Sequence, residues 1–116
     1  MLVLDRKSNQ IVRVDEVTGA VIDVFVSPGS GGLREPRAAV FGPDGHVYVA
    51  SSGTSQVLEY DGRTGRFLGV FAADASLTDP ADLAFGPDGD LYVGAEARIL
   101  RISGRTGKVE IGRAHV

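Results

Sequence analysis

The sequence predicts an all-β fold assembled from a unit of four antiparallel strands that is repeated along the chain. Two observations lead to this prediction. One stretch is written twice, over Leu33–Arg66 and again over Leu77–Lys108. Within each copy the apolar residues form short runs that are rich in β-branched and aromatic residues and end at Gly, Pro, Asp or Ser, which is typical of strands joined by turns. A repeat of this length indicates a modular architecture, so the unit determines the fold.

Matching landmarks in the copies measure the period of the repeat. Pro36 and Pro80 are 44 residues apart. A partial copy lies upstream, because N-Q-I-V-R-V-D over residues 9–15 matches S-Q-V-L-E-Y-D over residues 55–61, 46 positions later. Carrying this match back to Met1 places the start of the chain inside a unit. We therefore expect the sequence to be a fragment of a longer repeat protein.

Four strands are expected in the complete copy, in chain order at 37–41, 46–50, 56–60 and 67–71. No stretch of ten or more residues has the apolar stripe and caps of a helix. The three copies then divide the chain into a partial blade with the last three strands, a complete blade with its leading loop, and a partial blade with the first three strands, at 1–26, 27–72 and 73–109.

The turns between these strands repeat as well. The segment F-G-P-D-G joins the first two strands at 41–45 and again at 85–89. Pro sets the backbone of such a turn, Asp suits the next position, and Gly accepts the positive φ that follows. The last two strands are joined by D-E-V-T-G, D-G-R-T-G and S-G-R-T-G, at 15–19, 61–65 and 103–107. Tight hairpins of this kind predict antiparallel neighbours.

Units of four antiparallel strands at this period predict the blades of a β-propeller. Leucine-rich and hexapeptide units are shorter, and helical repeats need a helical periodicity that is absent here. Each blade packs its faces on its neighbours, so a segment with open outer faces exposes apolar side chains. We therefore expect poor solubility or swapped oligomers. The aromatics at equivalent positions are expected in the core: Tyr48 with Tyr92, Phe41 with Phe85, and Phe25 with Phe71.

Composition excludes several function classes. The net charge is −3 and the basic residues are scattered, so no nucleic-acid groove is predicted. The chain has no cysteine, which excludes disulfides and cysteine metal sites. No apolar run is long enough to cross a membrane.

The last seven residues, 110–116, break the repeat. They read E-I-G-R-A-H-V, which places Gly and Arg where the earlier copies have Val and Phe in their fourth strand. The same peptide resembles an in-frame translation of a common short-read sequencing adapter. We therefore expect residues 110–116 to be non-native and the natural sequence to stop near Val109.

The complete copy resembles the NHL-type repeats of bacterial β-propellers. The resemblance rests on L-x-x-P-x-x-x-x-F-G-P-D-G-x-x-Y-V-A followed by Q-V-L-E-Y-D-G-x-T-G. It implies a six-bladed ring and favours an extracellular or periplasmic location. It does not fix the function, since such blades serve binding proteins and enzymes alike. Gluconolactonase-like lactonases and virginiamycin B lyases share the architecture. The lactonases hold a divalent cation in the channel with acidic and Asn ligands. The cofactor of this chain is unknown, and it would be Ca or Mg only if the chain belongs to such an enzyme.

In a propeller the first strand of each blade lines the channel, and the loops before it and between the second and third strands form one rim. That rim is expected at 27–35, 51–55, 73–79 and 95–98. On it or beside it, Arg34 and Arg37 are candidates for an anionic ligand, and Asp82 and Glu96 for a cation or a general base. The alternatives are surface arginines, a turn-capping Asp and a solvated Glu.

No catalytic residue and no metal site are assigned from the sequence. His46 follows a tight turn at the end opposite the rim and is interpreted as a solvated turn residue. The leading hypothesis is a non-catalytic scaffold that binds a protein, peptide or glycan through the rim. It rests on the near identity of the units and on their channel strands, where most residues are apolar. The alternative is a fragment of a metal-dependent lactonase-like hydrolase or a streptogramin-lyase-like enzyme, for which Asp82, in place of Ala38, is the one hint.

Overall fold

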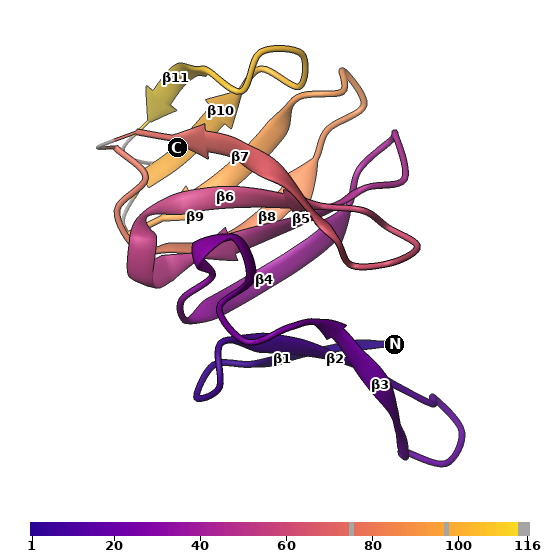
Figure 1. Ribbon diagram of the computed structural model, residues 1–116. Helices are drawn as coiled ribbons and strands as arrows, with labels where there is room; N and C mark the ends of the chain where they lie inside the picture. Colours follow the sequence, from indigo (N-terminus) through magenta and orange to yellow (C-terminus); the bar gives the residue numbers. More distant parts are fainter. Residues whose placement is uncertain (75, 97, 114–116) are drawn as a thin grey trace.

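The computed structural model describes residues 1–74, 76–96 and 98–113. In this part of the chain the strands form three antiparallel sheets, and the helical segments are two single 3-10 turns, η1 (Ser30–Gly32) and η2 (Ser52–Thr54). The sheets lie in succession along the chain, each made from consecutive strands (Figure 1). The prediction of an all-β fold of antiparallel blades, a partial β-propeller, is confirmed.

Each sheet is one blade of the segment. The first blade has the order β1-β2-β3, with bounds Leu2–Asp5, Gln10–Val14 and Val21–Val26. The middle blade has the order β4-β5-β6-β7, with bounds Pro36–Phe41, Val47–Ser51, Gln56–Tyr60 and Phe67–Ala73. The third blade has the order β8-β9-β10-β11, with bounds Pro80–Phe85, Leu91–Ala95, Arg98–Ile102 and Val109–Arg113.

The third blade differs from the expectation of three strands. Strand β11 pairs antiparallel with β10 and closes the blade with a fourth strand. Ladder hydrogen bonds use only backbone groups, so an extended segment can satisfy the free edge of β10 whatever its side chains. The pairing of β11 does not test whether residues 110–116 are native, so their non-native origin stays a prediction. His115 of the same segment lies outside the described residues.

The middle blade is buried on both of its faces. All five residues of β5 are buried. Val47 and Val49 face the first blade, whereas Tyr48 and Ala50 face the third. Because successive strand residues point to opposite faces, a strand between two blades must be apolar at every position. This explains the apolar run over residues 47–50, and the buried Ser51 that ends β5 is hydrogen-bonded to the backbone of Arg34.

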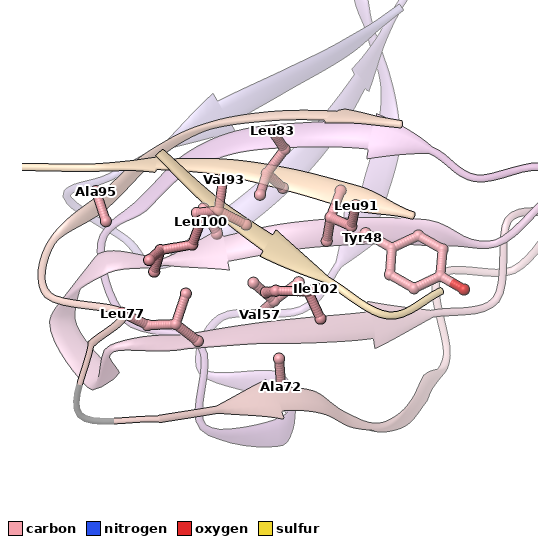
Figure 2. Packing of buried hydrophobic residues seen from close by; sticks show 11 residues of the cluster. Tyr48, Val57, Ala72, Leu77, Leu83, Leu91, Val93, Ala95, Leu100 and Ile102 are labelled. Atoms are coloured by element: carbon pink, nitrogen blue, oxygen red, sulfur yellow. The ribbon is translucent and has the colours of Figure 1, made fainter. Parts of the chain in front are cut away.

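Two separate cores join the three blades. The first core lies between the first and middle blades and contains Ile11, Phe25, Val26, Leu33, Val47, Val49, Leu58 and Tyr60. The second core lies between the middle and third blades and contains Tyr48, Ala50, Val57, Ala72, Leu77, Leu83, Leu91, Val93, Ala95, Leu100 and Ile102 (Figure 2). Each core receives one fully buried leucine from a loop, Leu33 in the first and Leu77 in the second.

The expectation that Phe41 lies in the core is wrong. Its equivalent Phe85 packs edge-on against Tyr48, with ring centroids 5.0 Å apart. One blade earlier, Leu2 stands at the position of Tyr48 and offers no ring, and Phe41 is 56% exposed. A shorter side chain in the preceding blade therefore leaves the same aromatic position uncovered.

In the middle and third blades, the turn between the last two strands contacts the backbone of the preceding blade. A Cβ on Gly65 would overlap the carbonyl oxygen of Phe25, and one on Gly107 would overlap that of Phe71. Both glycines also have φ near +75°, which disfavours any side chain. The repeated T-G dipeptide therefore serves both the turn and the packing of one blade on the next.

The outer faces of the segment expose apolar side chains. Val21, Ile22 and Val24 of β3 are 64%, 57% and 49% exposed, and Ile99 of the third blade is 46% exposed. The equivalent of Ile99 in the middle blade is Val57, which is fully buried in the second core. The open face of the third blade therefore has the apolar character that binds a neighbouring blade.

We expect the chain to self-associate through these open faces. Size-exclusion chromatography at rising concentration should show oligomers, and Ile99→Glu should shift the population toward monomer because it places a charge on the apolar face. Leu68→Glu is the matched control, since Leu68 is 40% exposed but lies on the middle blade, which is already covered on both faces. A wild-type chain that stays monomeric would contradict this expectation.

Within the described residues, no helix has the length and apolar character needed to cross a membrane.

Candidate functional site at the propeller rim

Loops from neighbouring blades meet at one end of the segment and form the expected rim. The side chain of Arg37, on β4, pairs with Asp79, just before β8, at 3.3 Å between Nη1 and Oδ1. Ser52, at the start of η2, donates its hydroxyl to the same carboxylate oxygen at 2.5 Å. Two segments of the middle blade therefore converge on one carboxylate at the start of the third blade.

Asp79 is held as an anion. The hydrogen bond from Ser52 and, beyond it, the positive charges of Arg37 and Arg6 hold the pKa of this carboxyl below its usual value. Arg6 comes from the first blade, between β1 and β2. The rim therefore places arginines of two blades around a single fixed negative charge.

The equivalent contacts one blade earlier tie the first blade to the middle blade. The backbone amide of Glu35 donates to Oδ1 of Asn9 at 2.8 Å. The carbonyl of Glu35 accepts from the amide of Ser52 at 3.2 Å. Polar contacts therefore link the rim loops of neighbouring blades.

Backbone strain gathers on the rim. The non-glycine residues with positive φ in the described chain all lie in its loops: Asn9, Glu35, Ser55, Asp79 and Glu96. A left-handed conformation costs a residue with a side chain about 1–2 kcal/mol and persists only where the surroundings enforce it. Such clustering is typical of loops that hold a defined shape for binding.

Arg34 has a fixed backbone and a free side chain. Its amide donates to the hydroxyl of Ser51, which is fully buried, and its carbonyl accepts from Ser51 and from the amide of Gly53. A Cβ at Gly53 would approach that of Arg34 to 2.8 Å, so the loop needs glycine there. The guanidinium is exposed and makes no hydrogen bond or ion pair with the described part of the chain.

Asp82 and Glu96 are not brought into a ligand set. Asp82 lies on β8 opposite Gly94, whose missing side chain gives it room. It lines a shallow hollow of 180 Å³ on the open face of the third blade, together with Leu83, Ala84, Tyr92, Val93, Gly94 and Ile99. Glu96 is an exposed turn residue with φ 51°. Among the described residues, neither belongs to a group of three metal-ligating side chains.

A second polar cluster lies at the opposite end and was missed by sequence reasoning. Asp44, His46 and Glu59 bring one potential ligand atom each within 4.8 Å of one another. Glu59 is distant along the chain and reaches the others because β5 and β6 pair Tyr48 with Glu59. The signal available in the sequence was Glu59 itself, since the other copies have Arg13 and Arg101 at this position.

No protein-family model matches the chain, and no curated protein matches it either. Solved structures do match. Hydrazine synthase of Kuenenia stuttgartiensis aligns over 96% of this chain and 31% of its own, with TM-score 0.74 and 18% identity. Selenomethionine-substituted virginiamycin B lyase from Staphylococcus aureus aligns over 94% of this chain and 36% of its own, with TM-score 0.67 and 17% identity.

A catalytically inactive variant of the same lyase with Quinupristin aligns over 94% of this chain and 39% of its own, with TM-score 0.66 and 16% identity. The chain therefore spans about a third of the length of the structures that it matches. At such low identity the likeness concerns the fold alone. The chain is thus a propeller-like segment, by its own blades and by these neighbours.

Proposed function

We propose that this chain is an NHL-like propeller segment that acts as a non-catalytic scaffold and binds a protein, peptide or glycan through its rim. The observation that supports this most is Arg34, an exposed guanidinium without a partner among the described residues, on a backbone fixed by Ser51 and Gly53. Because the backbone is fixed, only the side-chain rotamers must be ordered on binding, and the guanidinium offers a planar fork to a carboxylate. An acidic peptide is the partner that best fits it.

Arg37 adds to this interpretation. Within the described part of the chain its partner is Asp79, in an ion pair whose side chains are 34% and 49% exposed. An exposed pair of this kind contributes little to stability, so a ligand carboxylate can compete for the guanidinium at small cost. Arg34 and Arg37 then form a short basic edge beside the channel strand.

The proposal is tested on immobilised acidic peptides, with anionic glycans as a second set. We expect Arg34→Glu to weaken binding at least about tenfold, because it replaces an attractive charge by a repulsive one. Arg63→Glu is the matched control, since Arg63 is an equally exposed arginine in a turn at the opposite end. Equal losses in both variants would mean non-specific charge attraction, and no binding to either set would overturn the proposal.

The second candidate function is catalysis, as a part of a lactonase-like or lyase-like enzyme. It is favoured by Asp82, a carboxylate that faces the hollow on β8, and by the two virginiamycin B lyase structures among the neighbours. Ca²⁺ or Mg²⁺ would serve it as a cofactor held by oxygen ligands. Metal uptake and lactone or streptogramin turnover that both vanish in Asp82→Ala would replace the scaffold proposal with this one.

A further inference from the structure

The cluster at the end opposite the rim has the composition of a metal site. His46 Nδ1 lies 2.5 Å from Oε2 of Glu59 and 3.2 Å from Oδ2 of Asp44. The two carboxylates come from different elements, Asp44 from the turn before β5 and Glu59 from β6. One imidazole nitrogen and two carboxylate oxygens therefore converge on one point at the surface of the middle blade.

The neighbouring blades show what this corner normally contains. In the third blade, Arg101 stands at the position of Glu59 and binds Asp90, the equivalent of His46, at 2.8 Å between Nε and Oδ2. In the first blade Arg13 occupies the same position and pairs with Asp23. The third blade thus fixes a cation at this corner, and the first blade has an arginine at the same strand position. The middle blade has a carboxylate in its place.

The exchange leaves a local excess of negative charge in the middle blade. Asp44 and Glu59 both lie against the imidazole of His46. No arginine or lysine pairs with Asp44 or Glu59 within the described residues. A bound cation would supply here the positive charge that Arg101 supplies in the third blade.

We propose that Asp44, His46 and Glu59 bind a divalent transition-metal ion such as Zn²⁺, through Nδ1 of the histidine and one oxygen of each carboxylate. A histidine in the set favours Zn²⁺ over Ca²⁺ or Mg²⁺, which prefer oxygen ligands alone. With bonds of about 2.0–2.2 Å, tetrahedral ligand atoms lie about 3.3 Å apart. The distance of 3.2 Å between His46 Nδ1 and Asp44 Oδ2 already fits this geometry. The distance of 2.5 Å between His46 Nδ1 and Glu59 Oε2 must lengthen when the metal binds.

The surroundings of the cluster hold its carboxylates in place. The hydroxyl of Tyr48 lies 2.7 Å from Oδ2 of Asp44 and 3.3 Å from Oε2 of Glu59. Burial and the adjacent carboxylates raise the pKa of Tyr48, so its hydroxyl stays a neutral donor. Hydrogen bonds of this kind orient metal ligands. The three ligands and the exposed edge of His46 leave a fourth position open to water.

The test is a titration of the full chain with Zn²⁺ and with Co²⁺ as a spectroscopic probe. It is repeated at rising pH, because a proton competes with the metal for Nδ1 of His46. We expect one equivalent of metal, a Co²⁺ absorption band of tetrahedral type, and a higher unfolding temperature with metal bound. All variants carry His115→Ala, so that the terminal histidine cannot contribute a ligand.

The matched control converts this corner to that of the third blade. His46→Asp together with Glu59→Arg reproduces the ion pair of Asp90 and Arg101. The middle blade then has the same side chains at this corner as the third blade, which tolerates them. We expect it to fold and to lose metal affinity at least about a hundredfold, in line with loss of ligands. His46→Gln alone should lose the Co²⁺ band. Failure of the folded wild-type chain to bind Zn²⁺, or unchanged binding in the double variant, would overturn the proposal.

Discussion

Replacing Gly65 with Ala is expected to destabilise the chain more than replacing Gly19, although the two glycines occupy the same position of the same turn. Their φ angles are +77° and +76°. A Cβ on Gly19 would meet nothing within 4 Å, whereas one on Gly65 would overlap the carbonyl oxygen of Phe25 in the preceding blade. The pair therefore separates backbone strain from packing between blades.

The expected loss of stability in each variant follows from backbone strain and, at Gly65, from the added clash between blades. A left-handed alanine costs about 1–2 kcal/mol in either variant. Gly65→Ala adds a backbone displacement at the blade interface, for which overpacking suggests about 1–3 kcal/mol more. Urea unfolding at a single protein concentration measures both, because self-association would otherwise change the apparent stability.

Gly107→Ala provides the internal control for this comparison. Gly107 has φ +74° and lies against the carbonyl of Phe71, so it repeats the geometry of Gly65 one blade later. We expect its loss of stability to resemble that of Gly65→Ala. Equal losses at Gly19 and Gly65 would show that the turn conformation alone requires glycine, and that the blade contact contributes nothing.

The strands of this chain are predictable because local and repeated signals agree. β4, β5, β6 and β7 each begin and end within two residues of the ranges expected from the sequence. The Pro-Asp-Gly and Thr-Gly turns fix where a strand must stop, and the second copy removes the ambiguity of a single apolar run. The position of the rim loops could be predicted as well, because antiparallel strand order alone places alternate loops at the same end.

What the sequence did not predict depends on contacts between residues distant in the chain. The exposure of Phe41 depends on Leu2 of the preceding blade, and β11 forms because β10 has a free edge. The cluster around His46 needs the cross-strand register that places Glu59 beside Tyr48. A comparison of the copies for reversed charges would have found Glu59, whereas a search for conserved identity between copies passes over it.

Losses as large as that of Gly65→Ala are expected at the two loop leucines, in Leu33→Ala and Leu77→Ala. Both side chains are fully buried, and they are equivalent residues 44 positions apart in different cores. Removing such a side chain costs about 2–5 kcal/mol, because the cavity collapses only in part. Leu68→Ala, on an exposed side chain of the middle blade, should stay within about 0.5 kcal/mol of wild type.

The two leucine variants should also differ in where they loosen the chain, because each blade contacts only its neighbours. Leu77→Ala should speed amide hydrogen exchange in β9 and β10 and leave β2 protected, since Leu77 belongs to the second core. Leu33→Ala should do the reverse through the first core. Strand β6 contributes Val57 to one core and Leu58 to the other, so it should respond to both variants. Uniform loss of protection in all three sheets would instead identify a single cooperative unit, in which the middle blade transmits every local loss to both of its neighbours.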